Sequence, residues 1–582
     1  MSSTFTLRIK FAVTLVALCG LLSCTSSGSS DATAEATGQT AESDSGSSGN
    51  ALSGTVAQSP VDGFEASRFL AHATFGPTLE TIQQLQNTTY GDWIAEQMSL
   101  PYKTLREAFD EQQQLNPDSA PSRDWIFESF WRRSVVNEDQ LRQRVAFALS
   151  QLFVISLRDG GVASMPRGAA DFYSRLEQHA FGNFRELLEV VALHPVMGLY
   201  LSHLGNEKGD VLSGRQPDEN FAREVMQLFT IGLYELNANG TLKLSANSEP
   251  IETYSNADVQ GLARVFTGFS WGGPDKVLGR FQGWIADPNR DIMLMQSYPE
   301  LHSVREKQFL GTIISESDIS NPYQDLTIAL DTLFNHPNVG PFISRQLIQR
   351  MVSSNPSADY VERVASVFAD NGSGVRGDMA AVVTAVLMDA EARNPNAVPL
   401  SSRGRLREPI LRLSHWMRSF DATSASTRYS ILGTDDPATD LGMTVLRSPS
   451  VFNFYRPQYV PPNTAIAEAK LVSPEMQITH ETSVAGYLNS MLNTLELGGG
   501  SSFDISSDYV SAKAMAHSAP DLVDHINLLL THGSMSEELK SLIVQAVELV
   551  PMANENDEAA RLQRSQIAVY LAMASPEYLI LK

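Results

Sequence analysis

Apolar residues spaced three and four positions apart recur in segment after segment beyond Pro60. The pattern is clear in "DQLRQRVAFALSQLFVIS" (139–156) and in "FGNFRELLEVVALHPVMGLYLSHLG" (181–205). Such spacing places apolar side chains on one face of an α-helix, and the segments end at Gly, Pro or Asn, which terminate helices. "GDMAAVVTAVLMDAEAR" (377–393) is nearly all apolar before its charged end, which is typical of a helix in the centre of a bundle. The sequence therefore predicts an all-α body.

Evidence for strands is sparse. The best case is "LYELNANGTLKLS" (233–245), where Asn239-Gly240 has the composition of a hairpin turn. "GGGSSFD" (498–504) predicts a flexible loop, and a break near residues 497–503 would separate a terminal helical segment from the rest. We therefore expect a large multi-helix globular body over residues 61–582, with one or two small β-hairpins.

The chain is long and acidic. Its 582 residues and 43% hydrophobic content allow a large buried core, roughly three or four domain-sized units. The formal net charge is −23. Because an acidic chain without a large basic cluster is repelled by phosphate backbones, we expect no nucleic-acid partner. Cys19 and Cys24 are the only cysteines, so the body has neither a disulfide nor a thiolate metal site.

Residues 1–23 have the features of an export signal. Arg8 and Lys10 precede an apolar run from Phe11 to Leu22, which is short for a membrane span and right for a signal-peptide core. The run ends in "LLSC", which resembles the lipobox of bacterial lipoproteins, whose cysteine becomes the lipidated first residue of the mature chain. An ordinary secretory signal is the alternative, and both imply export. We predict a lipoprotein signal peptide and a membrane anchor through lipid on Cys24.

Residues 24–60 consist almost entirely of Ser, Gly, Ala, Thr, Asp, Glu and Gln. Such a segment has too little apolar surface to offset the entropy lost on ordering, so it predicts a disordered tether. Thr25 follows the cysteine where lipoproteins retained in the inner membrane typically carry Asp. The resemblance to lipoproteins thus implies the outer membrane of a Gram-negative bacterium, and it leaves open which side of that membrane the body faces.

"DENFAREVMQLFTIGLYEL" (218–236) carries an ordered polar stripe opposite an apolar one. We predict a helix that starts at Pro217-Asp218 and ends at Gly232. The predicted core-facing stripe consists of Phe221, Val225, Leu228 and Phe229. The polar stripe consists of Asn220, Arg223, Glu224 and Gln227. Glu219 and Arg223 are four residues apart, in the favourable orientation for an ion pair.

A second helix is predicted in "NADVQGLARVFTGFSW" (256–271), with Asn256 as its N-cap. It contributes Asp258 and Arg264. Because a hairpin lies between the two helices, they would pack antiparallel. We hypothesise that charged residues of both helices meet in one partly buried network. Its members are Arg223, Glu224, Arg264 and Asn220.

The stripe has two interpretations. As a functional site, it would use Glu224, Arg223 and Arg264 for chemistry. The candidate binding residues are Asn220, Gln227, Asp258, His203 and Asn206. His203 and Asn206 belong to this set because they lie one helical turn apart and can point the same way. The alternative is architecture alone, because buried Arg–Glu pairs often fix how helices pack.

Other polar residues have simpler expected roles. His194, followed by Pro195, predicts a helix-end histidine that bonds a carbonyl group. His302 and His336 precede loop-like residues and predict surface or capping groups. Glu306 and Lys307 are expected to be solvated.

The sequence predicts no metal site and no cofactor. It contains no HExxH motif and no His pair at four-residue spacing. "NANGT" (237–241) is half of an EF-hand pattern and is better explained as the hairpin turn. No GxSxG elbow appears, and Ser353-Ser354 lie at a helix end where they are expected to cap the next turn.

Six segments together resemble a known bacterial family. They are "PDENFAREVMQLFTIGLYELNANGT", "YSNADVQGLARVFTGFSW", "HPNVGPFISRQLIQRMVSSNP", "NGSGVRGDMAAVVTAVLMDAEAR", "REPILRL" and "SPSVFNFYRPQYVPP". In this order they are similar to the family catalogued as domain of unknown function 1800, from about Phe64 to the C-terminus. The resemblance implies a large helical exported protein and no established activity. It also implies a frequently co-encoded second exported family, which resembles sulfatases and alkaline phosphatases. One departure is "HSVREK" (302–307), where relatives tend to show His followed by Asp and Gly before a Glu-Lys pair.

Three functions agree with these observations. The preferred one is a binding or assembly scaffold for another exported protein, with the sulfatase- or phosphatase-like neighbour as first candidate partner. Its best exposed recognition element is "SPSVFNFYRPQYVPPN" (448–463), for which a packed loop is the alternative. The second function is an envelope glycan or polysaccharide hydrolase with Glu224 as general acid or base, which needs a second carboxylate facing Glu224. The candidates for it are Glu219, Asp258 and Glu189. The third is a purely structural envelope protein with the stripe sealed.

Overall fold

The computed structural model describes residues 58–582 except 395, 398, 400 and 401. In this part of the chain twenty-six α-helices dominate, and the named strands form four two-stranded antiparallel sheets. The prediction of an all-α body with small β elements is therefore confirmed. The predicted signal peptide, Cys24 and nearly all of the predicted tether lie outside the described residues.

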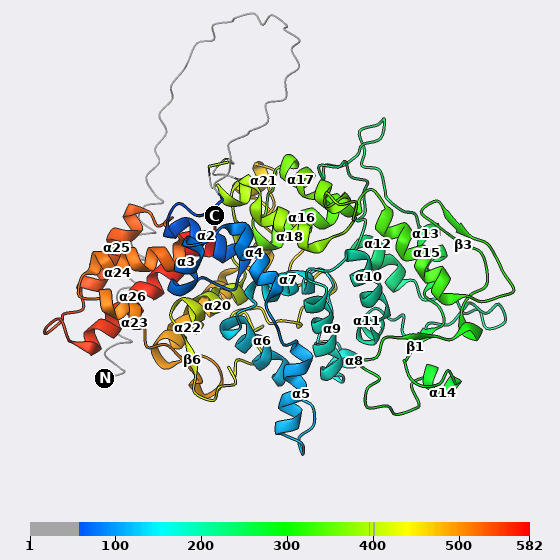
Figure 1. Cartoon of the computed structure of the whole chain (residues 1–582), viewed down its shortest axis with the longest axis horizontal. Coiled ribbons are helices and arrows are strands. Elements are labelled where there is room, and N and C mark those ends of the chain that lie inside the picture. The colour runs from blue at the N-terminus through cyan, green and yellow to red at the C-terminus, as the bar shows by residue number, and fades with distance from the viewer. Residues whose placement is uncertain (1–57, 395, 398, 400–401) are drawn as a thin grey trace, which may run out of the picture.

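The centre of the molecule brings helices of the N-terminal third together with helices from residues 339–468 (Figure 1). Its helices are α2 (Gly63–Ala73), α3 (Leu79–Gln86), α4 (Tyr90–Ser99), α5 (Leu105–Leu115), α6 (Asp124–Val136), α7 (Gln140–Ser150), α8 (Gly160–Ala163), α9 (Pro166–Gln178), α16 (Val339–Met351), α17 (Ala358–Ala369), α18 (Met379–Met388), α19 (Ala390–Arg393), α20 (Pro409–Ser419) and α21 (Ala465–Glu468). Strands β5 (Arg405–Leu406) and β8 (Ile580–Leu581) pair here and tie the C-terminus to the centre.

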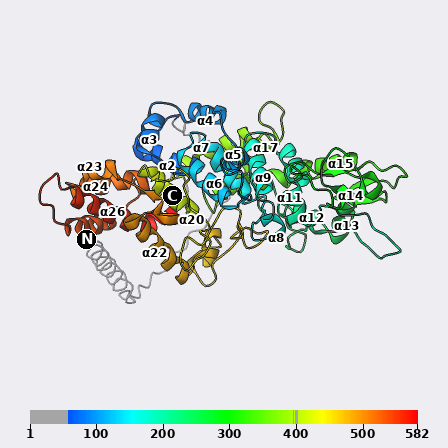
Figure 2. The same ribbon diagram turned by 90° about the horizontal axis from the view of Figure 1, so that it is seen from below.

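One end of the molecule, the hairpin end, is formed by residues 184–335. It contains α10 (Phe184–Leu193), α11 (Pro195–Tyr200), α12 (Asn220–Gln227), α13 (Asn256–Val265), α14 (Leu278–Phe281), α15 (Pro322–Asn335), β1 (Phe269–Ser270), β2 (Gln296–Ser297), β3 (Lys307–Phe309) and β4 (Thr312–Ile314). The opposite end contains α22 (Glu481–Leu497), α23 (Val510–Met515), α24 (Ala519–Ile526), α25 (Glu537–Glu548), α26 (Glu558–Ala574), α27 (Pro576–Leu579), β6 (Thr423–Ser424) and β7 (Ile505–Ser506). Figure 2 shows the two ends on opposite sides of the centre in a second view.

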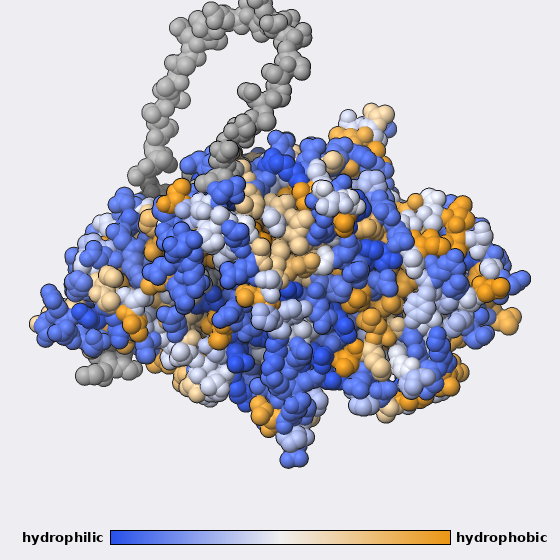
Figure 3. Space-filling model, viewed as in Figure 1, coloured by the Kyte–Doolittle hydropathy of each residue, from blue (hydrophilic) through white to orange (hydrophobic). Residues whose placement is uncertain are grey.

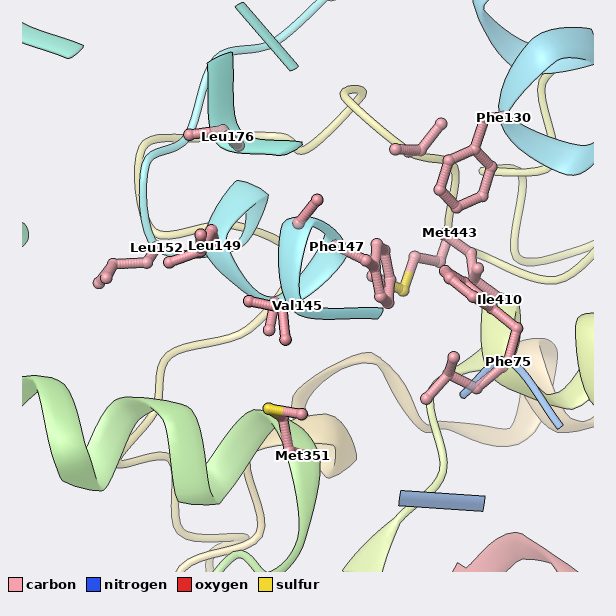
Figure 4. Close-up of a cluster of buried hydrophobic side chains, with 14 of the residues drawn as sticks. Phe75, Phe130, Val145, Phe147, Leu149, Leu152, Leu176, Met351, Ile410 and Met443 are labelled. Carbon is pink, nitrogen blue, oxygen red and sulfur yellow. The ribbon is translucent and has the colours of Figure 1, made fainter. Parts of the chain in front are cut away.

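The core is one large continuous cluster of buried apolar side chains, and α7 lies inside it. Every residue of α7 from Gln140 to Ser150 is buried, so this helix is covered on all sides. In Figure 4, Phe147 of α7 lies beside Phe130, Ile410 and Met443, which come from segments far apart in the sequence. Contacts of this kind join segments that are distant along the described chain in one continuous core.

The predicted hairpin turn at Asn239-Gly240 is present. The Asn237 N–H donates to the Thr241 carbonyl at 2.8 Å, and Gly240 adopts a φ of 73°, which glycine tolerates best. The flanking residues form isolated bridges, Leu236 with Leu242 and Leu244 with Pro250, rather than a continuous strand pair. No helix in the described part of the chain combines the length and the apolar character needed to cross a membrane.

The segment 498–504, predicted as a flexible loop, forms backbone hydrogen bonds with neighbouring segments. Gly499 and Ile505 exchange backbone hydrogen bonds of 2.7 and 2.9 Å, and the Ser501 N–H donates to the Ser430 carbonyl at 2.7 Å. On either side of the loop, α22 packs against α26, and β7 pairs with β6. The division of the chain into domains stays a prediction.

Candidate functional site

Helix α12 carries the polar stripe, and it is shorter than the sequence pattern indicated. It ends at Gln227, and the following turn closes on Gly232, which has a φ of 73°. Phe221, Val225 and Phe229 are buried as predicted, because α12 packs against α13 and the core, whereas Leu228 is only half-buried. Helix α13 begins one residue earlier than predicted: Ser255, not Asn256, is the N-cap, and it forms a capping box with Asp258.

The predicted ion pair on α12 is present. Arg223 Nη2 lies 3.4 Å from Glu219 Oε2, and the Arg223 side chain is 41% exposed. The same nitrogen lies 3.3 Å from Asn256 Oδ1 at the start of α13. At this exposure the pair contributes little to stability, so Arg223 is a surface residue between two helices.

Glu224 is the buried member of the stripe. Only 9% of it is exposed, and its Oε2 has no hydrogen-bond partner among the described residues. Burial raises its pKa, although the Arg223 guanidinium opposes the shift. A carboxyl group in such a place ionises less readily than one exposed to water.

The three carboxylates expected to face Glu224 have other partners among the described residues. Glu219 pairs with Arg223, and Glu189 pairs with Arg185 at 2.8 Å. Asp258 accepts from Ser255 and from the Leu310 N–H at 2.8 Å, which fixes the start of α13 against β3. Each of the three candidates is thus engaged elsewhere.

The four-residue network expected across α12 and α13 is not formed among the described residues. Arg264 instead donates from Nη1 to the Glu306 carbonyl at 2.6 Å, beyond the far side of α13. Asn220 is exposed, and its Nδ2 lies 3.4 Å from the Ser202 hydroxyl. The prediction failed for Arg264 because α13 directs this side chain toward the start of β3. Helical spacing alone does not specify that direction.

The remaining predicted binding residues hold loops in place. The Asn206 side chain makes two hydrogen bonds with the Asp218 backbone. Its Oδ1 accepts from the Asp218 N–H at 2.9 Å, and its Nδ2 donates to the Asp218 carbonyl at 3.3 Å. His203 stacks on Phe221 with ring centroids 3.8 Å apart and bonds the Ala192 carbonyl through Nε2, and burial lowers its pKa to about 4. Gln227 accepts from the Tyr254 hydroxyl at 3.3 Å. These contacts are architectural, and a functional role of the stripe stays a prediction.

His302 and Lys307, expected at the surface, are buried in an ionic cluster at the hairpin end. Asp325 of α15 lies 3.0 Å from His302 Nε2 and 2.8 Å from Lys307 Nζ. Burial raises the pKa of Asp325, but its two partners outweigh burial, so the net shift is downward. The expectation was wrong because the partner carboxylate lies on a helix that follows the "HSVREK" segment. Glu306 is exposed, as predicted.

The other histidines and the Ser353-Ser354 pair agree with expectation only in part. His194 caps α11 through the Val196 N–H, and its Nε2 lies 3.3 Å from the Asp171 carboxylate instead of a carbonyl. His336 accepts the Asn338 N–H, which is a capping role as predicted. The N-cap of α17 is Ser357, so Ser353-Ser354 do not cap it.

A second ionic cluster lies in the centre of the molecule and was missed by sequence reasoning. Arg405 of β5 pairs with Glu408, which precedes α20, and with Glu475 at 3.3 Å; all three are essentially inaccessible. Arg405 and Arg144 of α7 both donate to the Arg350 carbonyl in α16. The cluster thereby fastens α7, α16 and α20 to each other.

Polar groups of the loop at 448–463 complete this central cluster. The Tyr455 hydroxyl lies 2.8 Å from Gln151 Oε1 and 3.1 Å from Glu408 Oε1. Asn453, Phe454 and Tyr455 are buried, so the packed-loop alternative describes this segment. Burial raises the pKa of Glu475 to about 7, whereas the Arg405 guanidinium outweighs burial at Glu408 and lowers its pKa. The sequence offered one indication of this cluster: Glu408, Arg350 and Tyr455 each lie in a different one of the six segments that resemble the family.

The fold and these clusters define a class of protein: an all-α globule in which sealed ionic clusters join helices from distant parts of the chain. A family model described as protein of unknown function (DUF1800) matches residues 68–580, so the chain belongs to this family. Comparison with curated proteins and with solved structures gives no match. Among the described residues, no three or more His, Cys, Asp or Glu side chains are grouped so that they could hold a metal ion.

Proposed function

We propose that this protein is an exported, lipid-anchored component of the bacterial cell envelope that binds another exported protein through its hairpin end. The anchor is the lipid on Cys24, and the outer membrane is its location. The co-encoded sulfatase- or phosphatase-like protein that the family resemblance implies is the first candidate partner.

The observation that carries the proposal is the concentration of exposed apolar side chains at the hairpin end. Of twenty-five large apolar residues exposed in the described chain, twelve lie between Val211 and Tyr323, a stretch of less than a quarter of that chain. The most exposed are Leu212 at 98%, Ile319 at 80%, and Val211 and Trp284 at 76% each. In Figure 3, hydrophobic side chains follow the rim of this end.

Exposed apolar side chains support a binding role for a physical reason. Single ones are ordinary on a protein surface, but a gathering of them lowers solubility unless a partner covers them. Burying each one on a partner contributes roughly 1 to 3 kcal/mol. The irregular hairpin of this end, with its isolated bridges, exposes Leu233, Tyr234, Leu242 and Leu244 to solvent.

The two alternative functions have less support. The hydrolase needs a carboxylate opposite Glu224, and each candidate carboxylate is engaged elsewhere. A purely structural protein agrees with the architectural role of the stripe, but it leaves the apolar hairpin end without a purpose.

Affinity capture from the native envelope tests the proposal. The wild-type protein is compared with the double variant Leu212→Ser, Trp284→Ser, and bound proteins are identified by mass spectrometry. The matched control is Leu115→Ser, Leu549→Ser, which removes side chains that are 75% and 70% exposed outside the hairpin end. We expect one exported protein to be lost from the first variant and kept by the control. Identical partners for both double variants would refute the proposal.

A further inference from the structure

A cavity of about 320 Å³ lies where α20, α22 and the loop 498–501 come together. Helix α22 lines it with the polar side chains of Ser490, Asn493 and Thr494, and α20 lines it with Leu413 and Trp416. The cavity belongs to neither the polar stripe nor the two ionic clusters. Its volume is suited to a ligand of about the size of one sugar ring.

Asp440 provides the single carboxylate of the cavity lining. Its Oδ1 accepts the Leu441 N–H at 2.9 Å and faces the Ser490 hydroxyl at 3.4 Å, and no ion pair is formed by Asp440 in the described chain. Burial, with a smaller effect of Asp436 and Asp435, raises its pKa to about 6. At neutral pH the group is therefore mostly ionised and lacks a cation.

Asp440 gives the cavity lining a charge of one sign. The lining contains no Lys, Arg or His. Asp435 already pairs with Arg158 and with Arg447, the latter at 2.9 Å. The residues that α20, α22 and the loop contribute carry no titratable side chain, so Asp440 alone responds to pH inside the cavity. Such a lining repels anions and favours a cation.

The cavity wall is preformed. Gly498 and Gly500 have φ values of 103° and 72°, and a Cβ added at Gly500 would lie 2.8 Å from the Ser430 carbonyl oxygen. Ser502 and Phe503 also adopt positive φ, which is costly for residues with side chains. Strain of this kind persists only where the surrounding contacts hold the loop in one shape.

We propose that this cavity binds a small hydroxylated primary amine, with its ammonium group on Asp440 and its hydroxyl groups on Ser490, Asn493 and Thr494. The unpaired carboxylate selects the cation. The hydroxyl and amide side chains select a ligand that both donates and accepts hydrogen bonds. The site is independent of the hairpin end, so its test and the capture experiment can fail separately.

Calorimetric titration of the full-length protein tests the site with three probes of similar shape. Glucosamine carries the amine, N-acetylglucosamine blocks it, and glucose lacks it. We expect saturable binding of glucosamine at pH 7 and at least about tenfold weaker binding of the other two. Absence of saturable glucosamine binding, or equal binding of glucose, overturns the proposal.

The pH dependence and three variants sharpen the test. Between pH 7 and pH 5 Asp440 takes up a proton while the amine stays protonated, so affinity is expected to fall about tenfold. Asp440→Asn should reduce glucosamine binding to the level of glucose, and Ser490→Ala should weaken it several-fold. Asp436→Asn is the control: it changes the net charge by the same amount as Asp440→Asn, but Asp436 lies outside the lining. This variant should bind glucosamine within about twofold of wild type. Unchanged binding by both Asp440→Asn and Ser490→Ala contradicts the site.

Discussion

Asp325 supplies the carboxylate partner of both His302 and Lys307, in a position that water barely reaches. Lys307 is only 2% exposed, and its other bonds go to the carbonyls of Ser303 and Arg305. Removing one partner of a buried pair costs more than the pair contributes, because the remaining charge stays desolvated. The carboxylate is thus a structural requirement of the hairpin end.

Asp325→Asn is expected to lower the free energy of unfolding by about 3 to 5 kcal/mol, since it leaves the Lys307 ammonium without a counter-charge. Urea denaturation measures the effect. Asp331→Asn on the same helix is the control: that side chain is 52% exposed and pairs with Arg185, so its loss should cost less than about 1 kcal/mol. Equal costs for the two variants would contradict the assignment of a buried cluster.

Glu475 makes stability depend on pH. Burial raises its folded-state pKa to about 7, above the unfolded value of about 4.3, so the folded protein binds this proton more tightly. Its contribution is therefore fully present below pH 4.3 and is lost as pH rises through 7. Glu475→Gln mimics the protonated form. We expect the variant to gain on the order of 2 kcal/mol over wild type between pH 5 and pH 8, measured by urea unfolding at both pH values. A difference that does not change with pH would argue against a shifted Glu475.

At the scale of elements, α13 shows that close packing can set the direction of a side chain where sequence spacing does not predict it. Gly261 faces the backbone of β3, and a Cβ there would lie 1.7 Å from the Gln308 carbonyl oxygen. This approach holds α13 against the β3–β4 hairpin, and the same approach turns Arg264 to the Glu306 carbonyl. A glycine in a helix interior thus has a packing reason here, despite its cost to helix propensity.

Gly261→Ala should destabilise the protein by about 3 kcal/mol or more, because α13 must move away from β3. Gly91→Ala in α4 is the matched control. Its new methyl group would meet nothing closer than its own turn at 3.9 Å, and alanine is the better helix former, so stability should stay equal or rise by about 0.5 kcal/mol. Thermal unfolding of both variants distinguishes the two effects. A tolerated Gly261→Ala would show that the helix and the strand are not in close contact.

At the scale of the whole molecule, the described chain begins in the half that lies away from the hairpin end (Figures 1 and 2). Helix α2 packs on α7, α18 and α19 of the centre and on the segment 527–531 of the C-terminal end. A lipid anchor ahead of α2 would therefore attach to the half opposite the proposed binding surface. Such an anchor would leave the apolar hairpin end accessible to a partner.

Cys24→Ser tests the anchor. Wild-type protein should be recovered almost entirely with the membrane fraction, and the variant should be released into the soluble fraction of the envelope, because a single residue carries the lipid. Fractionation with immunoblotting measures the distribution, and mass spectrometry of the mature N-terminus identifies the lipid. Membrane retention of the variant, or an unmodified wild-type N-terminus, would refute the lipoprotein assignment.

The sequence by itself determined the helical class, the helices in the segments that it singled out, the turn at Asn239-Gly240 and the family, because these depend on local spacing and turn chemistry that survive in any packing. It also predicted the Glu219–Arg223 pair, whose partners lie one turn apart. Only the tertiary structure decided which charges meet. Asp325 with Lys307, Glu475 with Arg405, and Asp440 with its cavity involve groups that are distant along the chain or that become buried only when distant helices cover them. Burial and partner choice are properties of the packed molecule, so the ionic clusters and the cavity appear only in three dimensions.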